Sequence, residues 1–372
     1  MKKTFAEVVL LARTGLNPRK NFKLGQGNNN YITIKNIKNN TLVIDENTDV
    51  VDDEAIKLIH KRSKIKKGDI LFASIGRMGD MYIIEDDPVG WDINESVFAF
   101  TLDTNIVRQK YFYYIFRVKS TLDYLASNSS GSTFKSIKMN QLKKMTFDIP
   151  PLEKQDQIVA TLDKVCNVIE MRKQELISLD DLIKARFVEM FGTLDNPAQK
   201  FEKATLKELC NKITDGKHGG CTSEEGTKRY FVGAREIYND EVHYDTAPEI
   251  NVDEFEKDYK RCNIEIGDFL IVNTGATIGK SAIASDERTE HTLLQKSVAL
   301  LKVKQELLNP MFLKWCYRVN TRMYMVESAS AQPNLLLSKI NATEIYVPDM
   351  KLQNQFADFV HQVNKSKFIR HY

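Results

Sequence analysis

The amino-acid sequence predicts an α+β fold in which two duplicated modules are separated by long helices that form an antiparallel coiled coil. Three observations predict this arrangement. The 372 residues are enough for two domains that each bury a core. The second half of the chain repeats the first at an offset of about 200 residues, and a heptad pattern of apolar residues lies between the copies.

The repeat consists of six matches in the same order, at offsets between 198 and 201 residues. Each match is short, but six in one order are hard to obtain by chance. The matched pairs are Tyr31–Ile37 with Tyr230–Ile237, Lys67–Leu71 with Ile266–Leu270, Gly76 and Gly79 with Gly275 and Gly279, Ser96 and Val97 with Ser297 and Val298, Phe147–Pro150 with Ile345–Pro348, and Gln155–Ile158 with Gln353–Phe356. An internal repeat of this kind identifies duplicated structural units, which we expect at residues 1–150 and 193–348.

Each predicted module begins with short runs that are rich in β-branched and aromatic residues and that end at or contain glycine. These runs are YITIKNI and GDILFASIG in the first module, and YFVGAREI and GDFLIVNTG in the second. Such runs are typical of β-strands closed by turns. A polar loop and then a helical pattern follow in each copy, so each module is expected to be α+β.

The segment at 151–192 is predicted to be one long helix, the central spacer. Its apolar residues recur in steps of three, four and seven, with Arg172 and Arg186 in the two skipped core positions. Pro150 and Pro151 precede the pattern and Gly192 follows it, as expected at the ends of a helix. The apolar positions are Ile158, Leu162, Val165, Ile169, Leu176, Leu179, Ile183 and Met190. They span 33 residues, about 50 Å of helix, which favours a coiled coil over a core helix of one domain.

The segment at 349–372 repeats the beginning of this helix and is the predicted partner. Phe356, Val360 and Val363 stand at the positions of Ile158, Leu162 and Val165. Antiparallel packing of the two helices would place the modules at opposite ends of a rod. The second copy lacks a counterpart of residues 173–191, so part of the central helix is expected to be free for a partner chain.

The composition excludes several classes of protein. No run approaches the roughly 18 to 20 apolar residues of a membrane span, and the first residues lack a signal-peptide cleavage site, so a cytoplasmic protein without membrane contact is expected. The five cysteines form no CxxC pair, so neither a metal site nor a disulfide framework is indicated. The net charge is +3, with the densest basic cluster at residues 57–67. Two interpretations of this cluster stay open, a phosphate-binding surface and a solvated helix face.

No catalytic motif is present. Gly275–Ser281 resembles a phosphate-binding loop, but only three residues separate its glycines where that motif needs four, and Asp80 takes the place of Lys280 in the first copy. A turn between two strands explains these glycines better. The six histidines form no metalloprotease pair, and no serine lies in a nucleophile elbow.

Three segments resemble the conserved regions of the specificity subunits of type I restriction-modification systems. They are Ile149–Ile158, Lys184–Gly192 with the sequence KARFVEMFG, and Val347–Gln355, and the resemblance covers essentially the whole chain. It implies that this chain supplies DNA sequence recognition and carries no catalytic centre and no cofactor. The implied partners are double-stranded DNA, two modification subunits that methylate adenine with S-adenosylmethionine, and restriction (motor-nuclease) subunits that use ATP and Mg²⁺.

The residues expected to touch DNA lie in equivalent loops of the two modules. Base edges are read by paired donors and acceptors on Arg, Lys, Asn and Gln, and the phosphates by small polar and basic groups. The candidates are Lys35, Lys61, Arg62, Ser74, Arg77, Ser132, Thr133 and Lys135 in the first module, and Arg235, Asn273, Thr274, Thr277, Lys280, Gln332 and Asn334 in the second. An ordinary solvated loop is the alternative for each of them.

Two modules that differ at these positions predict a bipartite and asymmetric DNA target with an unread gap. The competing interpretation is a protein-interaction scaffold, in which the coiled coil joins two binding modules that have no role with nucleic acid. A methyltransferase with its own recognition domain is disfavoured because the sequence shows no cofactor-binding loop.

Overall fold

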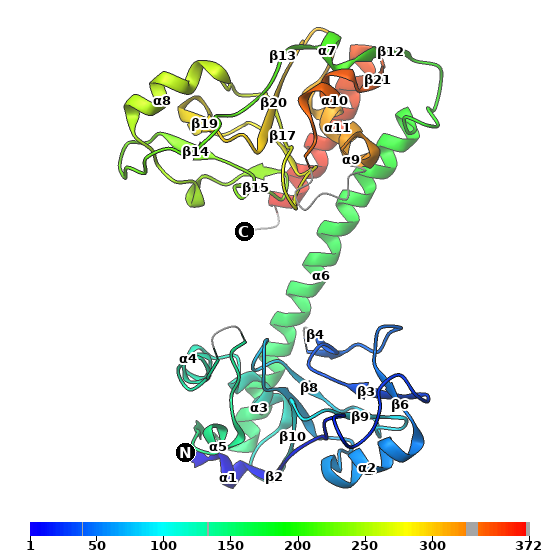
Figure 1. Cartoon of the computed structure of the whole chain (residues 1–372), viewed down its shortest axis with the longest axis vertical. Helices are drawn as coiled ribbons and strands as arrows, with labels where there is room; N and C mark the ends of the chain where they lie inside the picture. Colours follow the sequence, from blue (N-terminus) through cyan, green and yellow to red (C-terminus); the bar gives the residue numbers. More distant parts are fainter. Residues whose placement is uncertain (39, 132–133, 325–333, 370–372) are drawn as a thin grey trace. The chain divides into compact units, whose positions relative to one another are not determined.

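The computed structural model describes residues 1–38, 40–131, 134–324 and 334–369 of the chain (Figure 1). These residues pack as two units, 1–170 and 171–372, and each unit has its own hydrophobic core. Helix α6 (Leu152–Phe191) is continuous and contributes residues to both units. In the described part of the chain, no helix combines the length and the apolar character that crossing a bilayer requires.

The first unit contains eleven strands and five helices before α6 among its described residues. They are β1 (Lys2–Thr4), α1 (Phe5–Val8), β2 (Val9–Thr14), β3 (Asn29–Ile32), β4 (Ile37–Lys38), β5 (Thr41–Leu42), β6 (Val50–Val51), α2 (Asp53–Ser63), β7 (Ile70–Ala73), β8 (Met81–Ile83), β9 (Trp91–Ile93), β10 (Val97–Leu102), α3 (Gln109–Ile115), α4 (Lys119–Ser127), α5 (Met139–Leu142) and β11 (Thr146–Asp148).

Among its described residues the second unit largely repeats this order, but it has no counterpart of β6 or α4 and contains short 3₁₀ turns. Its described elements are β12 (Glu202–Thr205), α7 (Leu206–Leu209), β13 (Cys210–Asp215), β14 (Tyr230–Val232), β15 (Ile237–Tyr238), β16 (Glu241–Val242), η1 (Tyr244–Thr246), α8 (Val252–Asp258), η2 (Tyr259–Arg261), β17 (Phe269–Val272), β18 (Ser281–Ile283), η3 (Glu287–His291), β19 (Thr292–Leu294), β20 (Val298–Val303), α9 (Pro310–Val319), η4 (Thr321–Met323), α10 (Leu337–Ala342), β21 (Glu344–Val347) and α11 (Met350–Ile369).

The sheet topology confirms the duplication and the α+β fold. The main sheet of the first unit is antiparallel in the order β2-β10-β7-β8, and that of the second is β13-β20-β17-β18. Each unit also has a parallel pair, β3·β9 or β14·β19. The ladders pair Ile32 with Ile93 and Val232 with Leu294, so the two copies align at an offset of 200 residues along β3 and 201 residues along β9. Tyr31 therefore corresponds to Phe231, and the sequence match of Tyr31 with Tyr230 was wrong by one residue.

Both faces of each main sheet are buried, which explains why its strands lack polar alternation. In the first unit, Phe72 and Phe100 pack on one face with the helical residue Phe112. Leu71 and Ala99, which alternate with them along the strands, pack on the other face against the parallel pair β3·β9.

A buried glutamine joins each long helix to its unit. The side chain of Gln155 donates to the carbonyl oxygens of Ile106 and Pro150 and accepts from the backbone N–H of Arg108, each at 2.8 Å. Gln353 at the start of α11 makes the same three bonds, to Leu307, Pro348 and Asn309, at 2.7 to 3.1 Å. Three backbone groups that have no partner in a helix or sheet are thereby satisfied. The repeated glutamine in the sequence has this structural cause.

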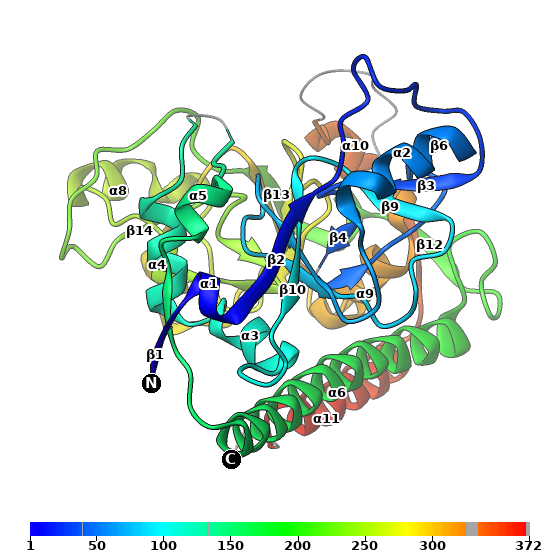
Figure 2. The same cartoon turned by 90° about the horizontal axis from the view of Figure 1, so that it is seen from below.

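Within the second unit, α11 lies antiparallel to the C-terminal part of α6, as the sequence predicted (Figure 2). The ring centroids of Phe187 and Phe356 are 5.2 Å apart, and the Lys367 ammonium lies 2.6 Å from the Asp180 carboxylate. Arg172, one of the skipped seam positions, donates to the carbonyl oxygen of Lys367. Its positive charge lies in the last turn of α11, where a helix favours cations.

The buried face of α6 in this unit differs from the predicted seam. Ile183, Phe187 and Phe191 are fully buried, whereas Met190 is only partly buried. These three residues are four positions apart in sequence, a spacing that places their side chains in one row on the helix surface. The seam with its 3.5-residue period therefore identified the helix but missed its two phenylalanines.

Candidate nucleic-acid interface

In each unit the structure brings together the two loops that the sequence selected. One loop is the hairpin between β7 and β8 in the first unit, or between β17 and β18 in the second. The other is the loop that contains Lys135 in the first unit, or Asn334 in the second. In the first unit, the backbone N–H of Gly76 donates to Lys135 and that of Ile137 donates to Ser74, at 3.1 and 2.9 Å. In the second, Leu335 donates to the carbonyl of Asn273 at 2.7 Å.

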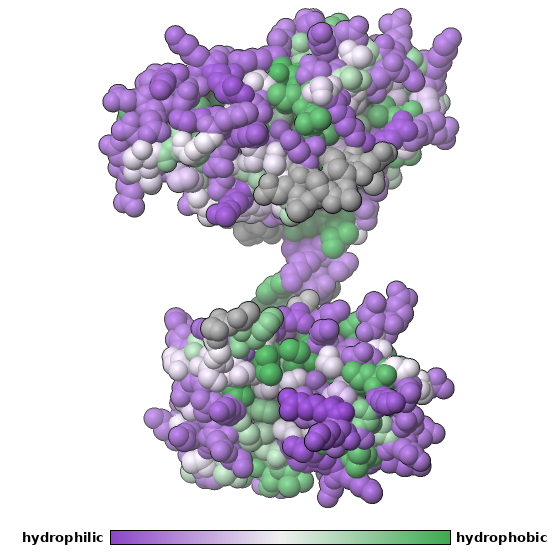
Figure 3. All heavy atoms as spheres, in the orientation of Figure 1, coloured by the Kyte–Doolittle hydropathy of each residue, from purple (hydrophilic) through white to green (hydrophobic). Residues whose placement is uncertain are grey.

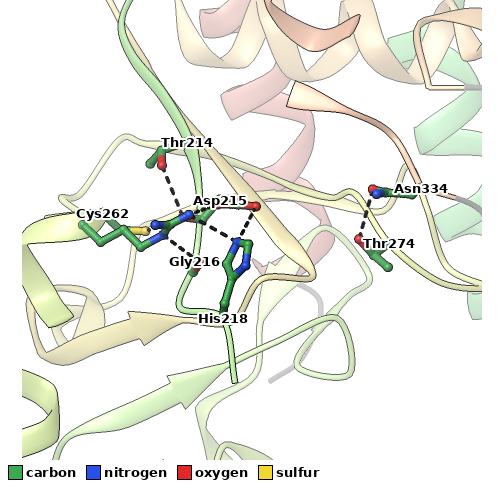
Figure 4. Close-up of polar contacts among 8 residues, drawn as sticks. Thr214, Asp215, Gly216, His218, Cys262, Thr274 and Asn334 are labelled. Atoms are coloured by element: carbon green, nitrogen blue, oxygen red, sulfur yellow. Dashed lines mark hydrogen bonds and ion pairs between the residues drawn. The ribbon is translucent and has the colours of Figure 1, made fainter. Parts of the chain in front are cut away.

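Figure 4 shows Thr274 and Asn334 facing each other across the two loops of the second unit. The Thr274 hydroxyl donates to the amide oxygen of Asn334 at 3.3 Å. Because residues 273–280 connect two antiparallel strands, the GATIGKS segment is a turn between strands, as expected. A phosphate-binding loop would lead from a strand into a helix.

Two adjoining hollows lie beside these loops in the second unit. One has a volume of about 440 Å³ and is lined by Lys217, Gly219, Thr274, Gln295, Lys296, Ser297 and Asn334. The other has a volume of about 530 Å³ and is lined by Ala234, Arg235, Glu236, Thr246, Pro248, Gln295 and Ser297. The two share Gln295 and Ser297. The predicted residues Arg235, Thr274 and Asn334 thus surround one polar surface, which we call the second-unit recognition surface.

The backbone that carries this surface is fixed by a close crossing. Lys217 donates its backbone N–H to Leu294 at 2.7 Å, and Lys296 donates to Lys217 at 2.9 Å. A Cβ on Gly216 would lie 2.1 Å from the Leu294 carbonyl oxygen, so only glycine permits this approach. Gly15 has the same role in the first unit, where a Cβ would lie 1.6 Å from the carbonyl oxygen of Ile93.

Sequence reasoning missed Lys217, Gln295, Lys296 and Ser297. Ser297 was recognised only as part of the repeat, although the polar residues that precede it in the turn between β19 and β20 were a usable signal. Lys217 could not be found in this way, because it reaches the surface through a crossing with a segment about 80 residues further along the chain.

The charges of the surface are not equally available. The ammonium of Lys217 lies 2.5 Å from Asp258 and 3.6 Å from Glu254, and the hydrogen bond to Asp258 raises the pKa of Lys217. Its positive charge is therefore already compensated. Arg235 and Lys296 are exposed and have no ion-pair partner within the described residues. These two cations are the ones that can meet a phosphate.

An ionic cluster next to this surface fixes the end of β13 (Figure 4). Arg261 donates through Nε to the carbonyl oxygens of Asp215 and Gly216, both at 2.9 Å, and its guanidinium contacts the Asp215 carboxylate. His218 lies 3.2 Å from the same carboxylate. In the first unit the equivalent Arg62 donates to the Thr14 hydroxyl at 3.3 Å. Arg62 is exposed, and its predicted contact with DNA stays a prediction.

In the first unit, Lys35, Arg77 and Lys135 lie around the hairpin. Arg77 is exposed and donates to the carbonyl oxygen of Ile37 at 2.9 Å, which ties the hairpin to the segment that carries Lys35. Lys35 is exposed at the rim of a hollow of about 210 Å³ that also contains Asp45 and Asp49. The first unit therefore presents a more mixed charge here than the second.

Ser74 and Asn273 do not present their side chains at the surface. Both are only 3% exposed, because the residue after the β7 or β17 strand continues the strand alternation and points inward. The Ser74 hydroxyl donates to the Ser96 carbonyl at 2.7 Å, and the Asn273 amide oxygen has no hydrogen-bond partner among the described residues. In this structure both side chains point inward, and their contact with DNA stays a prediction.

The remaining candidates are dispersed. Thr277 is half-buried and Lys280 is exposed in the hairpin. Lys61 is exposed on α2, beside a separate hollow of about 610 Å³ that also contains Trp91 and His60. Ser132, Thr133 and Gln332 lie outside the described residues. In the part of the chain that the structure describes, no three metal-binding side chains gather in one place.

Comparison with known proteins identifies the family of the chain. The model of the family "Type I restriction modification DNA specificity domain" matches residues 1–180 and 198–370. The chain therefore belongs to the family of type I restriction-modification DNA specificity proteins. The family is described as a DNA specificity domain, and its model matches both repeats of the chain.

Several relatives are similar to parts or all of the chain. The MjaIX specificity subunit of a type I restriction enzyme from Methanocaldococcus jannaschii is 30% identical over 110 residues, which are 30% of this chain and 25% of that protein. A putative type I specificity subunit from Haemophilus influenzae is 31% identical over 104 residues, 28% of this chain and 26% of that protein. The matched stretches thus span only about a quarter of these relatives.

Two solved structures share the fold over nearly the whole chain. The S subunit of a type I restriction-modification system from M. genitalium has a TM-score of 0.52 and 17% identity, covering 99% of this chain and 90% of that one. A structure titled for the complex assembly and conformational transition of the type I R-M system has a TM-score of 0.56 and 16% identity at the same coverages.

Proposed function

We propose that each unit reads one half of a bipartite DNA target, and that the helices set the distance between the halves and bind modification subunits. The observation that carries the proposal is the duplication of one α+β unit with its own core and its own pair of joined loops. Two separate readers of one kind suit a target with two separate half-sites.

The half-sites should differ in sequence, because equivalent positions of the two units carry different side chains. Lys35 corresponds to Arg235, and the hairpin residue Arg77 corresponds to Thr277. Donor and acceptor patterns that differ in this way select different base pairs in the major groove. The target is therefore asymmetric.

The cations near each pair of loops support binding to the phosphates. Arg235 and Lys296 in the second unit, and Lys35 and Lys135 in the first, are exposed beside polar hollows or loops. Contacts of this kind fix the register of a protein on the duplex and make binding strongly dependent on salt.

The exposed apolar residues of α6 support binding to other chains. Val165, Val168 and Ile169 in the first unit are 50 to 60% exposed, and Ile177 and Leu182 in the second are 49 to 54% exposed. Apolar patches of this kind mark interaction sites. In the proposal, one modification subunit covers each patch, and restriction subunits join the complex. S-adenosylmethionine, ATP and Mg²⁺ are then bound by those partner chains.

Exchange of one module tests the bipartite target. The chain is co-expressed with modification subunits, residues 1–150 are replaced by those of another family member, and methylated positions are mapped along the DNA. We expect one half-site to change and the other to stay. A continuous or palindromic motif, or a change in both halves, contradicts the proposal, as does a chain that stays separate from the modification subunits on a sizing column.

Shortening the helix tests its role in spacing. Removal of seven residues between 158 and 170, outside the pairing with α11, should change the length of the gap and leave both half-sites unchanged. A changed half-site with an unchanged gap would show that the helix does not set the distance.

A further inference from the structure

We infer that Gln295 determines specificity in the second unit and that its side-chain amide reads an adenine in the major groove. The inference rests on the proposed function of the second unit as the reader of one half-site. It names a residue and a base for that reader.

Gln295 has a central position on the second-unit recognition surface. It is one of the two residues that line both adjoining hollows. Lys296 lies on one side of it and Arg235 on the other, and both cations lack an ion-pair partner within the described residues. A duplex whose phosphates met these cations would bring base edges to the residue between them.

The amide of Gln295 is available for reading. Its only polar contact within the described residues is a hydrogen bond from Nε2 to the carbonyl oxygen of Phe231 at 3.5 Å, the outer limit for such a bond. The amide oxygen has no partner there. A glutamine amide accepts from N6 of adenine through its oxygen and donates to N7 through its nitrogen. Binding would replace one weak bond with two good ones.

The residue of the first unit that corresponds to Gln295 has a structural role. Asn94 is the equivalent residue, and its amide oxygen accepts hydrogen bonds from the backbone and hydroxyl of Ser96 and from the backbone of Val97, at 2.8 to 3.1 Å. It thereby fixes the turn before β10. In the second unit, the Gln295 side chain makes no bond to the equivalent turn residues, Ser297 and Val298. The longer side chain leaves the turn and points elsewhere.

Gly233 makes room for the amide in its new place. A Cβ on Gly233 would lie 2.4 Å from Oε1 and 2.5 Å from Cδ of Gln295. The backbone φ of Gly233 lies outside the left-handed region, so its conformation does not require glycine. The first unit has Thr33 here. The second unit therefore combines Gly233 with Gln295, whose amide is free to bind DNA. The first unit combines Thr33 with Asn94, whose amide is bonded to its own turn.

The test uses the complete chain with its modification subunits and a set of DNA duplexes in which every position of the mapped target is varied. The ratio of methylation rates between duplexes measures discrimination at each position. We expect Gln295→Ala to reduce discrimination at one adenine–thymine position of the second half-site by about tenfold or more, in line with the worth of a bidentate base contact. The first half-site should be unchanged.

Two further variants separate reading from folding. Gln295→Glu keeps the size but offers only acceptors, so the preference at that position should move from adenine toward cytosine. Gly233→Ala should displace the intact glutamine and relax the same position. Gln305→Ala, which removes an exposed glutamine outside both hollows, is the control and should leave discrimination unchanged.

The outcomes distinguish the inference from the proposed function. If all three variants at the site methylate the parent target with parent discrimination, Gln295 does not read a base, and the bipartite proposal stands. If the parent target has no second half-site, the proposed function itself fails. A shift toward cytosine in Gln295→Glu alone is enough to support base reading, even where Gln295→Ala does not fold.

Discussion

Equivalent residues of the two units often keep one side chain and exchange its partners. Asp69 is fully buried and accepts hydrogen bonds from Arg13 at 2.6 Å and Thr101 at 2.5 Å. Asp268, its counterpart, instead pairs with Lys302 at 2.8 Å. Burial raises the pKa of the Asp268 carboxyl, and the bond to Lys302 opposes this. The cation that compensates the carboxylate therefore lies on different strands in the two units, Arg13 on β2 and Lys302 on β20. The buried aspartate itself is present in both units.

The buried glutamines give a prediction at the scale of one residue. Gln353→Ala should lower the free energy of unfolding of the second unit by about 2–3 kcal/mol, because three buried backbone groups lose their partners. Amide hydrogen exchange in residues 171–372 measures the loss. Gln355→Ala is the matched control, since Gln355 is exposed on the same helix, and it should cost less than about 0.5 kcal/mol. Equal effects of the two variants would contradict the role of Gln353.

A titration gives a second prediction at this scale. Glu7 accepts hydrogen bonds from the backbone N–H and the hydroxyl of Thr4, at 2.7 and 2.9 Å. The backbone bond, together with Lys3 and the hydroxyl, lowers the pKa of Glu7 from 4.5 to about 2. Because the folded-state pKa is the lower one, this contribution to stability is present above pH 4.5 and is lost as the pH falls toward 2.

Side-chain NMR signals of Glu7 should therefore still report an ionised carboxylate at pH 3. Thr4→Val keeps the backbone N–H and should retain most of the shift. A midpoint near the ordinary value of 4.5 in the parent chain would show that the capping bonds are absent in solution.

The pairing of α6 with α11 is the feature that decides the core of the second unit at the scale of elements. Phe187 and Phe191 of α6 pack against Phe356 of α11 and Phe312 of α9, with ring centroids 4.9 to 5.7 Å apart. Aromatic contacts of this kind add to the free energy of burial. The helix pair is therefore part of the second unit's core and not an appendage to it.

Truncation of one ring in this cluster should be costly. Phe356→Ala should lower the free energy of unfolding by about 3–5 kcal/mol, the usual range for a fully buried phenylalanine. Ile177→Ala, on the exposed side of α6, should change it by less than about 0.5 kcal/mol. Denaturant unfolding followed by circular dichroism measures both. A small effect of Phe356→Ala would mean that α11 does not pack on α6.

Two separate cores characterise the whole chain. The largest cluster of the first unit contains only residues up to Ile149, and that of the second contains only residues from Ile183 onward. Units with separate cores unfold as separate cooperative blocks unless their interface is large. This independence is also what the exchange of one recognition module requires. Figure 3 shows polar residues over much of the visible face of the second unit and a more mixed face on the first.

Local stability should therefore respond to mutation one unit at a time. Phe72→Ala should speed amide exchange in residues 1–170 and leave residues 171–372 nearly unchanged, and Phe269→Ala should do the reverse. Both side chains are fully buried in equivalent strands, so each variant is the control for the other. Exchange that rises across both units in either variant would show a single cooperative block.

The duplication, the α+β class, the long helix and its antiparallel partner helix could all be predicted from the sequence. Each of these features follows from a local pattern, either the period of the apolar residues or the order of the short repeats. Such patterns can be recognised in the sequence without a structure. The matched glutamines at 155 and 353 were visible in the same way, although their hydrogen bonds were not.

The set of residues that meet at the candidate recognition surface depends on tertiary contacts and could not be predicted from the sequence. Lys217 and Gln295 come together because β13 crosses the turn before β20, and no periodicity records such a crossing. Likewise, Ser74 and Asn273 have the composition of exposed loop residues, but the direction of the preceding strand turns them inward. The buried face of α6 also depends on tertiary packing. The helix has several apolar positions, and Phe187 and Phe191 are buried because they pack against the neighbouring helices.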